Sequence, residues 1–352
     1  MIYILLLLIL AILYVIIEIF KYSKNRRKNF LIISTLLLSI LSGIRYNVGT
    51  DYNNYVVSFV NQFNYSFWDF SYISRDYGFY FIYKLIGIFT KEYSIALTII
   101  SLLTVSLISS TIYSYSKMPL FSILLYITLN FYTFSFNGVR QALAVAICVY
   151  SFRFIVDGDF RKFICCLIIA STIHFSAIVF IIAWISRDYI LKGFKSYIGG
   201  MSFITAILFA NNIIELLLNN FYKNYSYDSF GMSGMPIGLV ILIPICIGLF
   251  IFFLKTKLYA NDRNNIALVN IGIVTMLFFI YSTKISNFTR IAEYFYIFSI
   301  ITIPNAVSIF KKRGDRAILI TAIFSLAFIW FYLSTIRGNL HNVLPYYTIF
   351  DV

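Results

Sequence analysis

Long apolar blocks constrain this chain more than any other feature of its sequence. A helix rising ~1.5 Å per residue needs about 17–25 apolar residues to cross a hydrocarbon core of ~30 Å. Clean blocks occupy residues 2–20, 30–44, 94–113, 120–136, 163–185, 237–254 and 317–333, and polar residues interrupt further blocks at 139–156, 197–218, 266–281 and 291–310. The pattern predicts an all-α fold, a polytopic integral membrane helical bundle of about 11 (10–12) transmembrane helices.

The composition agrees with a membrane protein. The chain is 61% hydrophobic and only 12% charged, whereas soluble domains carry about a quarter charged residues. Its net charge of +14 could indicate nucleic-acid binding in a soluble protein. In a membrane protein it indicates basic cytoplasmic loops, so no nucleic-acid partner is expected.

Basic clusters predict the topology. The clusters at 21–28 and 311–316 are typical of cytoplasmic loops. One transmembrane domain is expected over residues 1–352, with its N-terminus outside and extracytoplasmic loops at about 46–93 and 219–236. The first loop contains an apolar stretch that is short for a span, so short interfacial helices are expected there.

Counting crossings from the two basic clusters gives a conflict between residues 163 and 218. Either that region hides an extra crossing, or the short stretch at 77–89 spans the membrane. We favour the extra crossing, because it places the polar candidates described below on one side.

Arginines at helix ends are candidate phosphate ligands, because ionisable groups at membrane depth are costly. Arg140 follows a short Asn137-Gly138 turn at the start of a helix, where the helix dipole disfavours a cation. Arg45 ends an earlier helix, and Gly49 allows a turn that could return Asp51 towards it. The simpler interpretations are a snorkelling Arg140 and a helix-end salt bridge for Arg45.

Two histidines occur in the chain. His174 lies well inside an apolar block, where it is either a hydrogen-bonded core residue or a general base. His341 lies near the end and is interpreted as a loop residue.

Arg290, Glu293 and Tyr294 share one helix face by their spacing. The simpler interpretation is that Arg290 and Glu293 neutralise each other, and the alternative is that Arg290 contacts phosphate or sugar. The 29 Tyr and 37 Phe also suit stacking on sugar rings, although some form interfacial belts.

Several motifs are absent from the sequence. It contains no P-loop, no GxGxxG opening a helix and no HExxH. A nucleotide-driven pump is therefore disfavoured.

The order of several short motifs resembles the EpsG family, within the Wzy-type polysaccharide polymerases. The matching pieces are Gly43-Ile-Arg45-Tyr46-Asn-Val-Gly49-Thr50-Asp51-Tyr52, Asp76-Tyr77-Gly78-Phe79, Asn137-Gly138-Val139-Arg140-Gln141-Ala142-Leu143-Ala144, His174-Phe175-Ser176-Ala177, Arg290-Ile-Ala-Glu-Tyr294-Phe295 with Pro304, and Pro345-Tyr346.

The resemblance implies a metal-independent glycosyltransferase of the bacterial cytoplasmic membrane that needs no cofactor and no nucleotide sugar. Such proteins join undecaprenyl-diphosphate-linked oligosaccharide repeats into capsule, exopolysaccharide or O-antigen. A flippase and a chain-length regulator are candidate partners, besides membrane lipid.

The implied site divides into catalytic and binding residues. The catalytic candidates are His174 as first choice of base, Asp51 as second, and Arg140. The candidate diphosphate and sugar contacts are Arg45, Arg140, Arg290, Tyr46, Tyr52, Asn137, Gln141 and Tyr294. No metal site is expected.

Other activities stay open from the sequence. A lipid-linked glycan flippase or polysaccharide exporter would use the same cations without bond chemistry. An O-antigen ligase-like enzyme would differ in its acceptor, and an O-acyltransferase would also use an intramembrane histidine.

Overall fold

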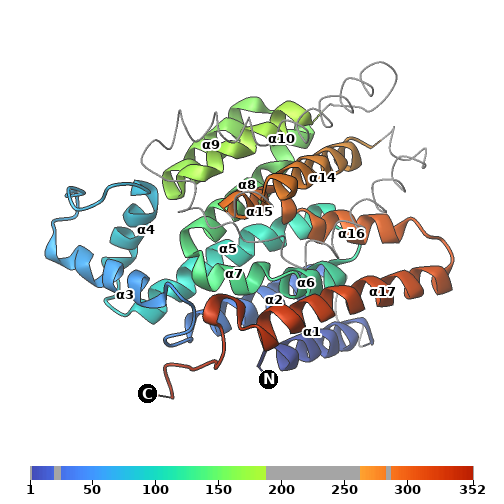
Figure 1. Cartoon of the computed structure of the whole chain (residues 1–352), viewed down its shortest axis with the longest axis horizontal. Coiled ribbons are helices and arrows are strands. Elements are labelled where there is room, and N and C mark those ends of the chain that lie inside the picture. The colour runs from blue at the N-terminus through green and yellow to red at the C-terminus, as the bar shows by residue number, and fades with distance from the viewer. Residues whose placement is uncertain (1, 20–24, 188–261, 283–286, 352) are drawn as a thin grey trace.

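A computed structural model describes residues 2–19, 25–187, 262–282 and 287–351 (Figure 1). Apart from one isolated bridge between Arg45 and Thr348, the regular structure of these residues is helical. The helices are α1 (Ile2–Ile19), α2 (Arg26–Gly43), α3 (Tyr52–Asn61), η1 (Gln62–Asn64), α4 (Tyr77–Gly87), α5 (Tyr93–Tyr115), α6 (Pro119–Thr128), α7 (Phe131–Asn137), α8 (Val139–Asp157), α9 (Phe160–Ile173), η2 (Phe175–Phe180), α10 (Ile181–Ser186), α14 (Arg263–Ser282), α15 (Asn287–Tyr296), α16 (Ser299–Ser308), α17 (Arg313–Phe331), η5 (Tyr332–Arg337) and η6 (Leu340–Asn342). The predicted all-α class is confirmed for this part of the chain.

Several of these helices are apolar and long enough to cross a membrane. Within the described ranges they are Tyr93–Tyr115, Val139–Asp157 and Arg313–Arg337, and there are five spans if the bent pairs α6–α7 and α15–α16 each count as one. The count of about 11 stays a prediction. Two of the predicted spans, 197–218 and 237–254, and the loop at 219–236 lie outside the described residues.

Helix α8 is central in the bundle, and α17 is peripheral, as their buried fractions show. Of the most apolar 18-residue stretch of each helix, 67% is buried in α8 but only 11% is buried in Arg313–Arg337. Helix α8 packs against α5, α7, α9, α14 and α15. The core therefore surrounds α8, and residues at the start of α8 are well placed to meet several other elements.

Local chemistry sets several helix boundaries. Pro119 begins α6, where its missing N–H has no intrahelical partner to lose. Asn130 is left-handed, with φ 68°, and separates α6 from α7, which meet at a bend of 48°. Gly158 ends α8 with φ 75°, and the Asp159 side chain then caps α9 by accepting from the Lys162 N–H.

The apolar block 163–185 is a hairpin rather than one continuous helix. Helix α9 ends at Ile173, and His174 has extended backbone, with φ −152° and ψ 113°. The chain then returns through η2 and α10, so the Trp184 ring lies 5.1 Å from both the Phe160 and the Phe163 ring near the start of α9. His174 thus lies at the tip of the hairpin.

This hairpin reverses the chain inside the region, residues 163 to 218, where the charge count predicts an extra crossing. The rest of that region, residues 188–218, lies outside the described residues, so the choice between an extra crossing and a spanning stretch at 77–89 stays a prediction. That stretch forms α4, whose 11 residues reach only about 17 Å as a helix. Helices α3 and α4 lie together at one end of the bundle (Figure 1).

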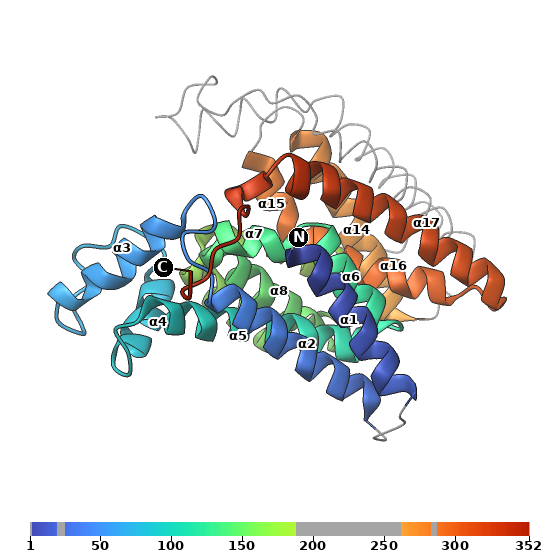
Figure 2. The same ribbon diagram turned by 90° about the horizontal axis from the view of Figure 1, so that it is seen from below.

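The C-terminal segment connects elements far apart in the sequence (Figure 2). The Tyr46 N–H donates to the Tyr347 carbonyl at 2.9 Å, and the Gly49 N–H donates to the Asn342 carbonyl at 3.0 Å. The Tyr3 hydroxyl donates to the Val343 carbonyl at 3.2 Å. The segment therefore holds the 44–51 turn against α1 and brings η6 to the end of the bundle that carries α3 and α4.

Candidate functional site

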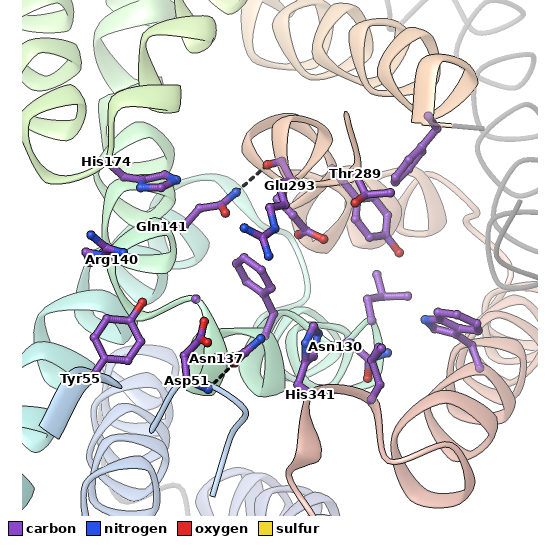
Figure 3. Close-up of a pocket in the computed structure, with 18 residues that line it drawn as sticks. Asp51, Tyr55, Asn130, Asn137, Arg140, Gln141, His174, Thr289, Glu293 and His341 are labelled. Atoms are coloured by element: carbon purple, nitrogen blue, oxygen red, sulfur yellow. Dashed lines mark hydrogen bonds between the residues drawn. The ribbon is translucent and has the colours of Figure 1, made fainter. Parts of the chain in front are cut away.

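A cavity of about 380 Å³ lies where α7 meets α8 (Figure 3). Its wall is formed by the start of α3, the break between α6 and α7, helices α7, α8, α14, α15 and α17, the His174 tip and η6. The lining residues are Asp51, Tyr55, Leu129, Asn130, Phe134, Asn137, Gly138, Arg140, Gln141, His174, Phe279, Thr289, Arg290, Glu293, Tyr296, Trp330, Leu340 and His341.

Asp76 does not line the cavity, but it contacts two residues that do, Arg140 and His174. One carboxylate oxygen, Oδ2, accepts from Arg140 Nη1 at 2.9 Å and lies 3.4 Å from His174 Nδ1. The other oxygen accepts from the Phe175 N–H at 3.2 Å. The Asp76 side chain is only 2% exposed, against 32% for Arg140 and 28% for His174. We call Asp76, Arg140 and His174 the paired cluster.

The environment of Asp76 keeps it ionised. Burial alone would raise the pKa of this carboxyl, but the hydrogen bond from His174, the charges of His174 and Arg140, and the Phe175 N–H outweigh it. The pKa of Asp76 therefore lies below its ordinary value, and the carboxylate can hold the imidazole Nδ1–H and the guanidinium at once.

The backbone explains how Asp76 reaches its partners. The helix break at His174 leaves the Phe175 N–H available for the carboxylate. Asp76 itself is left-handed, with φ 62°. Gly78 lets the start of α4 approach the end of α9, because a Cβ there would lie 2.9 Å from Thr172 Cβ and 3.0 Å from the Thr172 carbonyl carbon.

Arg140 lies in the first turn of α8, as the sequence predicted. The cost of a cation beside the positive end of the helix dipole is offset by the Asp76 carboxylate. The Tyr55 ring lies under the guanidinium, with 5.9 Å between the Arg140 Cζ and the ring centroid. Arg140 is therefore fixed in position before any ligand arrives.

Arg290, Glu293 and His341 form a second group in the cavity wall. None of their side chains makes a hydrogen bond or an ion pair within the described ranges. The interpretation that Arg290 and Glu293 neutralise each other is therefore wrong: they share a face of α15 but are not bonded. We call these three residues the unpaired cluster.

His341 is a loop residue, as interpreted, but it also lines the cavity. It is left-handed, with φ 67°, between Asn339 and Asn342, which are left-handed too. Burial, and then the positive charge of Arg290, lower the pKa of His341 to about 4. Its imidazole is therefore neutral at physiological pH and can accept or donate a hydrogen bond without carrying charge.

Arg45 is placed differently from the expectation. Its side chain is fully buried and lies outside the cavity wall, and it donates to Ser42 O at 3.0 Å, Ser42 Oγ at 2.7 Å and Phe136 O at 3.0 Å. Gly49 makes the expected turn, with φ 106°, but it brings Asp51 to Asn137 instead of Arg45. The Asp51 N–H donates to Asn137 Oδ1 at 2.9 Å.

The structure brings six of the ten predicted residues into one cavity. They are Asp51, Asn137, Arg140, Gln141, His174 and Arg290. Gln141 also donates to the Arg290 carbonyl and so links α8 to α15. Arg45, Tyr46, Tyr52 and Tyr294 do not line it.

The three tyrosines have other partners in the fold. Tyr46 and Tyr52 pack ring to ring, with 6.2 Å between centroids. Tyr294 is fully buried, and its hydroxyl lies 3.0 Å from Ser176 Oγ. Tyr294 therefore joins α15 to the hairpin instead of facing the cavity.

Asp76 is the main residue without a role in the sequence interpretation. The sequence did single out its position. Asp76 precedes an apolar stretch that is too short to span a membrane, and it belongs to one of the motifs of the family pattern. Glu293 and His341 were considered and given simpler roles. Tyr55, Asn130 and Trp330 carried no local signal, because aromatics and asparagines are abundant throughout the chain.

Comparison with known proteins places this chain in a family. No curated protein and no solved structure matches it. The description "EpsG family" matches residues 28–348, nearly the whole chain. These residues include both clusters and the entire cavity wall. The chain therefore belongs to the EpsG family, whose members are Wzy-type polymerases.

Proposed function

We propose that this protein polymerises undecaprenyl-diphosphate-linked oligosaccharide repeat units at the outer face of the bacterial cytoplasmic membrane. The growing glycan passes from its lipid diphosphate to a hydroxyl of the incoming lipid-linked repeat. The family membership supports a polysaccharide polymerase, and the paired cluster supports the transfer chemistry.

The reaction needs one proton acceptor. The acceptor hydroxyl oxygen forms a bond to the anomeric carbon of the growing chain, the bond from that carbon to the diphosphate oxygen breaks, and undecaprenyl diphosphate leaves with the bonding electrons. The hydroxyl proton passes to His174. With Nδ1 donating to Asp76, His174 presents Nε2 as the base.

Arginines balance the charge that develops on the leaving diphosphate. Arg140 is held by Asp76, so its position is fixed, but part of its charge is already compensated. Arg290 lines the same cavity, and no carboxylate among the described residues pairs with it. We assign Arg290 as the stronger diphosphate contact and Arg140 as a fixed contact beside the reacting atoms.

The observation that carries this proposal is the Asp76 carboxylate bonded at once to Arg140 and His174. A carboxylate that orients an imidazole beside a guanidinium is an arrangement suited to deprotonating a hydroxyl next to a departing anion. A carrier that only moves a glycan needs no oriented base.

The position of the cavity supports an outer-face reaction. The basic residues at the start of α2 lie at the opposite end of the bundle, where Arg27 donates to the carbonyl of Ser116, just beyond α5. Basic loops mark the cytoplasmic side, so the cavity faces away from it.

The test is a reconstituted polymerisation. Purified protein in liposomes is given the lipid-linked repeat unit extracted from cells that lack the protein, with EDTA and without nucleotide. A gel ladder is expected with the wild-type protein and no ladder with His174→Ala.

The alternatives predict other results. Movement of the lipid-linked repeat across the bilayer without a ladder would favour a flippase. Transfer only to a different glycan acceptor would favour a ligase, and a requirement for an acyl donor would favour an O-acyltransferase.

A further inference from the structure

The cavity has a chemically distinct half around Glu293. We propose that Glu293, together with the aromatic side chains around it, forms a sugar-binding subsite that holds a ring of the repeat unit through its hydroxyl groups. This inference rests on the proposed function, and it assigns a specificity-determining residue to that reaction.

Among the residues that the structure describes, the Glu293 carboxyl has no hydrogen-bond or ion-pair partner. It lines the main cavity and also a second, inner cavity of about 10 Å³ formed with residues of α5, α6, α7 and α8. Arg290 lies one turn earlier on the same helix, yet no ion pair joins them within the described ranges. Buried carboxyls that serve the fold are paired or hydrogen-bonded, so this one is available to a ligand.

The surroundings of Glu293 suit a sugar ring. Phe134, Phe279, Tyr296 and Trp330 line the same cavity. Aromatic faces pack against the apolar CH faces of a pyranose, and a carboxyl group exchanges hydrogen bonds with its hydroxyls. Tyr55, by contrast, is the aromatic ring that lies beside Arg140.

The neighbouring polar groups are held in place by the fold. The Asn130 side chain donates to Ser334 Oγ at 2.8 Å and accepts from Thr335 Oγ1 at 2.7 Å. This ties the α6–α7 break to the end of α17, the helix that carries Trp330. Figure 3 shows Asn130, Glu293 and His341 around one part of the cavity, away from Arg140 and Tyr55.

The division of the cavity assigns different parts of the substrate to different residues. The diphosphate is an anion and is matched by the Arg290 guanidinium, whereas the Glu293 carboxyl offers no positive charge and exchanges hydrogen bonds with neutral hydroxyl groups instead. Glu293 therefore contacts sugar and not the leaving group, and its loss weakens binding of a glycan that carries no phosphate.

The test is calorimetric titration with the free repeat-unit oligosaccharide, released from its lipid diphosphate by mild acid. Wild-type protein is expected to bind it. Glu293→Ala is expected to bind about tenfold to hundredfold more weakly, because the hydrogen bonds between the carboxyl and the sugar hydroxyls are lost. Glu293→Gln, which keeps one acceptor, is expected to fall between them.

Matched variants separate this role from a structural one. Glu92→Gln removes a carboxyl just before α5, outside the cavity, and should bind like wild type. Arg290→Ala should also keep oligosaccharide binding, since the probe carries no diphosphate. Trp330→Ala should weaken binding, and thermal midpoints identify any variant that does not fold.

Two results would overturn the subsite: no binding of the oligosaccharide to wild-type protein, or equal binding to wild type, Glu293→Gln and Trp330→Ala. Failure of the proposed function looks different. In that case the oligosaccharide binds and depends on Glu293, but the reconstituted protein makes no ladder.

Discussion

The two clusters of the cavity differ in how their charges are satisfied. In the paired cluster one carboxylate holds both Arg140 and His174 through bonds of 2.9 and 3.4 Å. In the unpaired cluster a cation and a carboxyl share one helix face without touching. Pre-paired groups suit chemistry, which needs fixed geometry, whereas unpaired groups suit recognition, where the ligand supplies the partner.

The difference has a backbone origin. The paired cluster lies where helices break: Asp76 precedes α4, Arg140 begins α8 and His174 ends α9. Breaks free backbone amides and bring three elements to one point. Arg290 and Glu293 lie within α15. Side chains on one helix lean in the same direction, so the two groups do not meet, and each needs a partner from another element or from a ligand.

The largest effect is expected in the paired cluster. Asp76→Asn removes the charge that holds Arg140 and His174, so the rate of ladder growth should fall about 10²- to 10⁴-fold, the range for losing an oriented base. The control is Asp69→Asn, an exposed carboxylate of the same loop region that accepts from the Ser71 N–H. A rate within about tenfold of wild type would remove the paired cluster from the mechanism.

A smaller loss is expected from Arg290→Ala in the unpaired cluster. The apparent affinity for the lipid-linked repeat should fall about tenfold to hundredfold, because charge-assisted bonds to phosphate are lost. The thermal midpoint should not change, since the Arg290 guanidinium has no ion-pair partner in the described part of the chain. Arg337→Ala, an exposed arginine at the same end of the bundle, is the control. Unchanged affinity would shift the diphosphate to Arg140.

Arg45 should respond in stability instead of activity. Arg45→Met leaves the buried Phe136 carbonyl without its donor, so unfolding should become easier by about 2–4 kcal/mol. Scanning calorimetry in detergent measures this, and the rate per folded molecule should match wild type. A normal thermal midpoint with lost affinity would instead restore Arg45 as a diphosphate ligand.

The smallest effect is expected for His341 with pH. Its pKa in the folded protein is about 4, below the ordinary value of about 6.5. The unfolded chain therefore takes up a proton first as pH falls, and the stability contribution, complete above pH ~6.5, is lost progressively towards pH ~4. The thermal midpoint should drop less between pH ~7 and ~5 in His341→Gln than in wild type. Equal drops would contradict the buried, neutral imidazole.

Much of the fold follows from local sequence. Nine of the predicted blocks fall on described helices, because apolar length and boundary residues such as Pro119 and Gly158 act over a few neighbours. The blocks at 120–136 and 291–310 are bent pairs of helices, and the block at 163–185 folds back as a hairpin. Its apolar composition does not distinguish one helix from a hairpin, since both bury the same side chains.

The candidate site was predictable only in part. Arg140 and His174 stood out in the sequence because charge and polarity are costly at membrane depth. Arg45 stood out for the same reason, yet its guanidinium is used to hold the carbonyl of Phe136, 91 residues away in sequence. The free-energy cost of a buried charge identifies residues that need a polar partner. It does not show whether that partner is a ligand or another part of the protein.

The sequence by itself determined the helical membrane class, the family pattern and the residues that require polar partners. Tertiary structure alone decided the pairings: Asp76 meets Arg140 across 64 residues and His174 across 98, while Arg290 and Glu293, three residues apart, do not pair. The length of an apolar stretch is a local property that can be counted along the chain, and it predicts where helices form. The choice of a polar partner depends on which elements pack together and where their helices break.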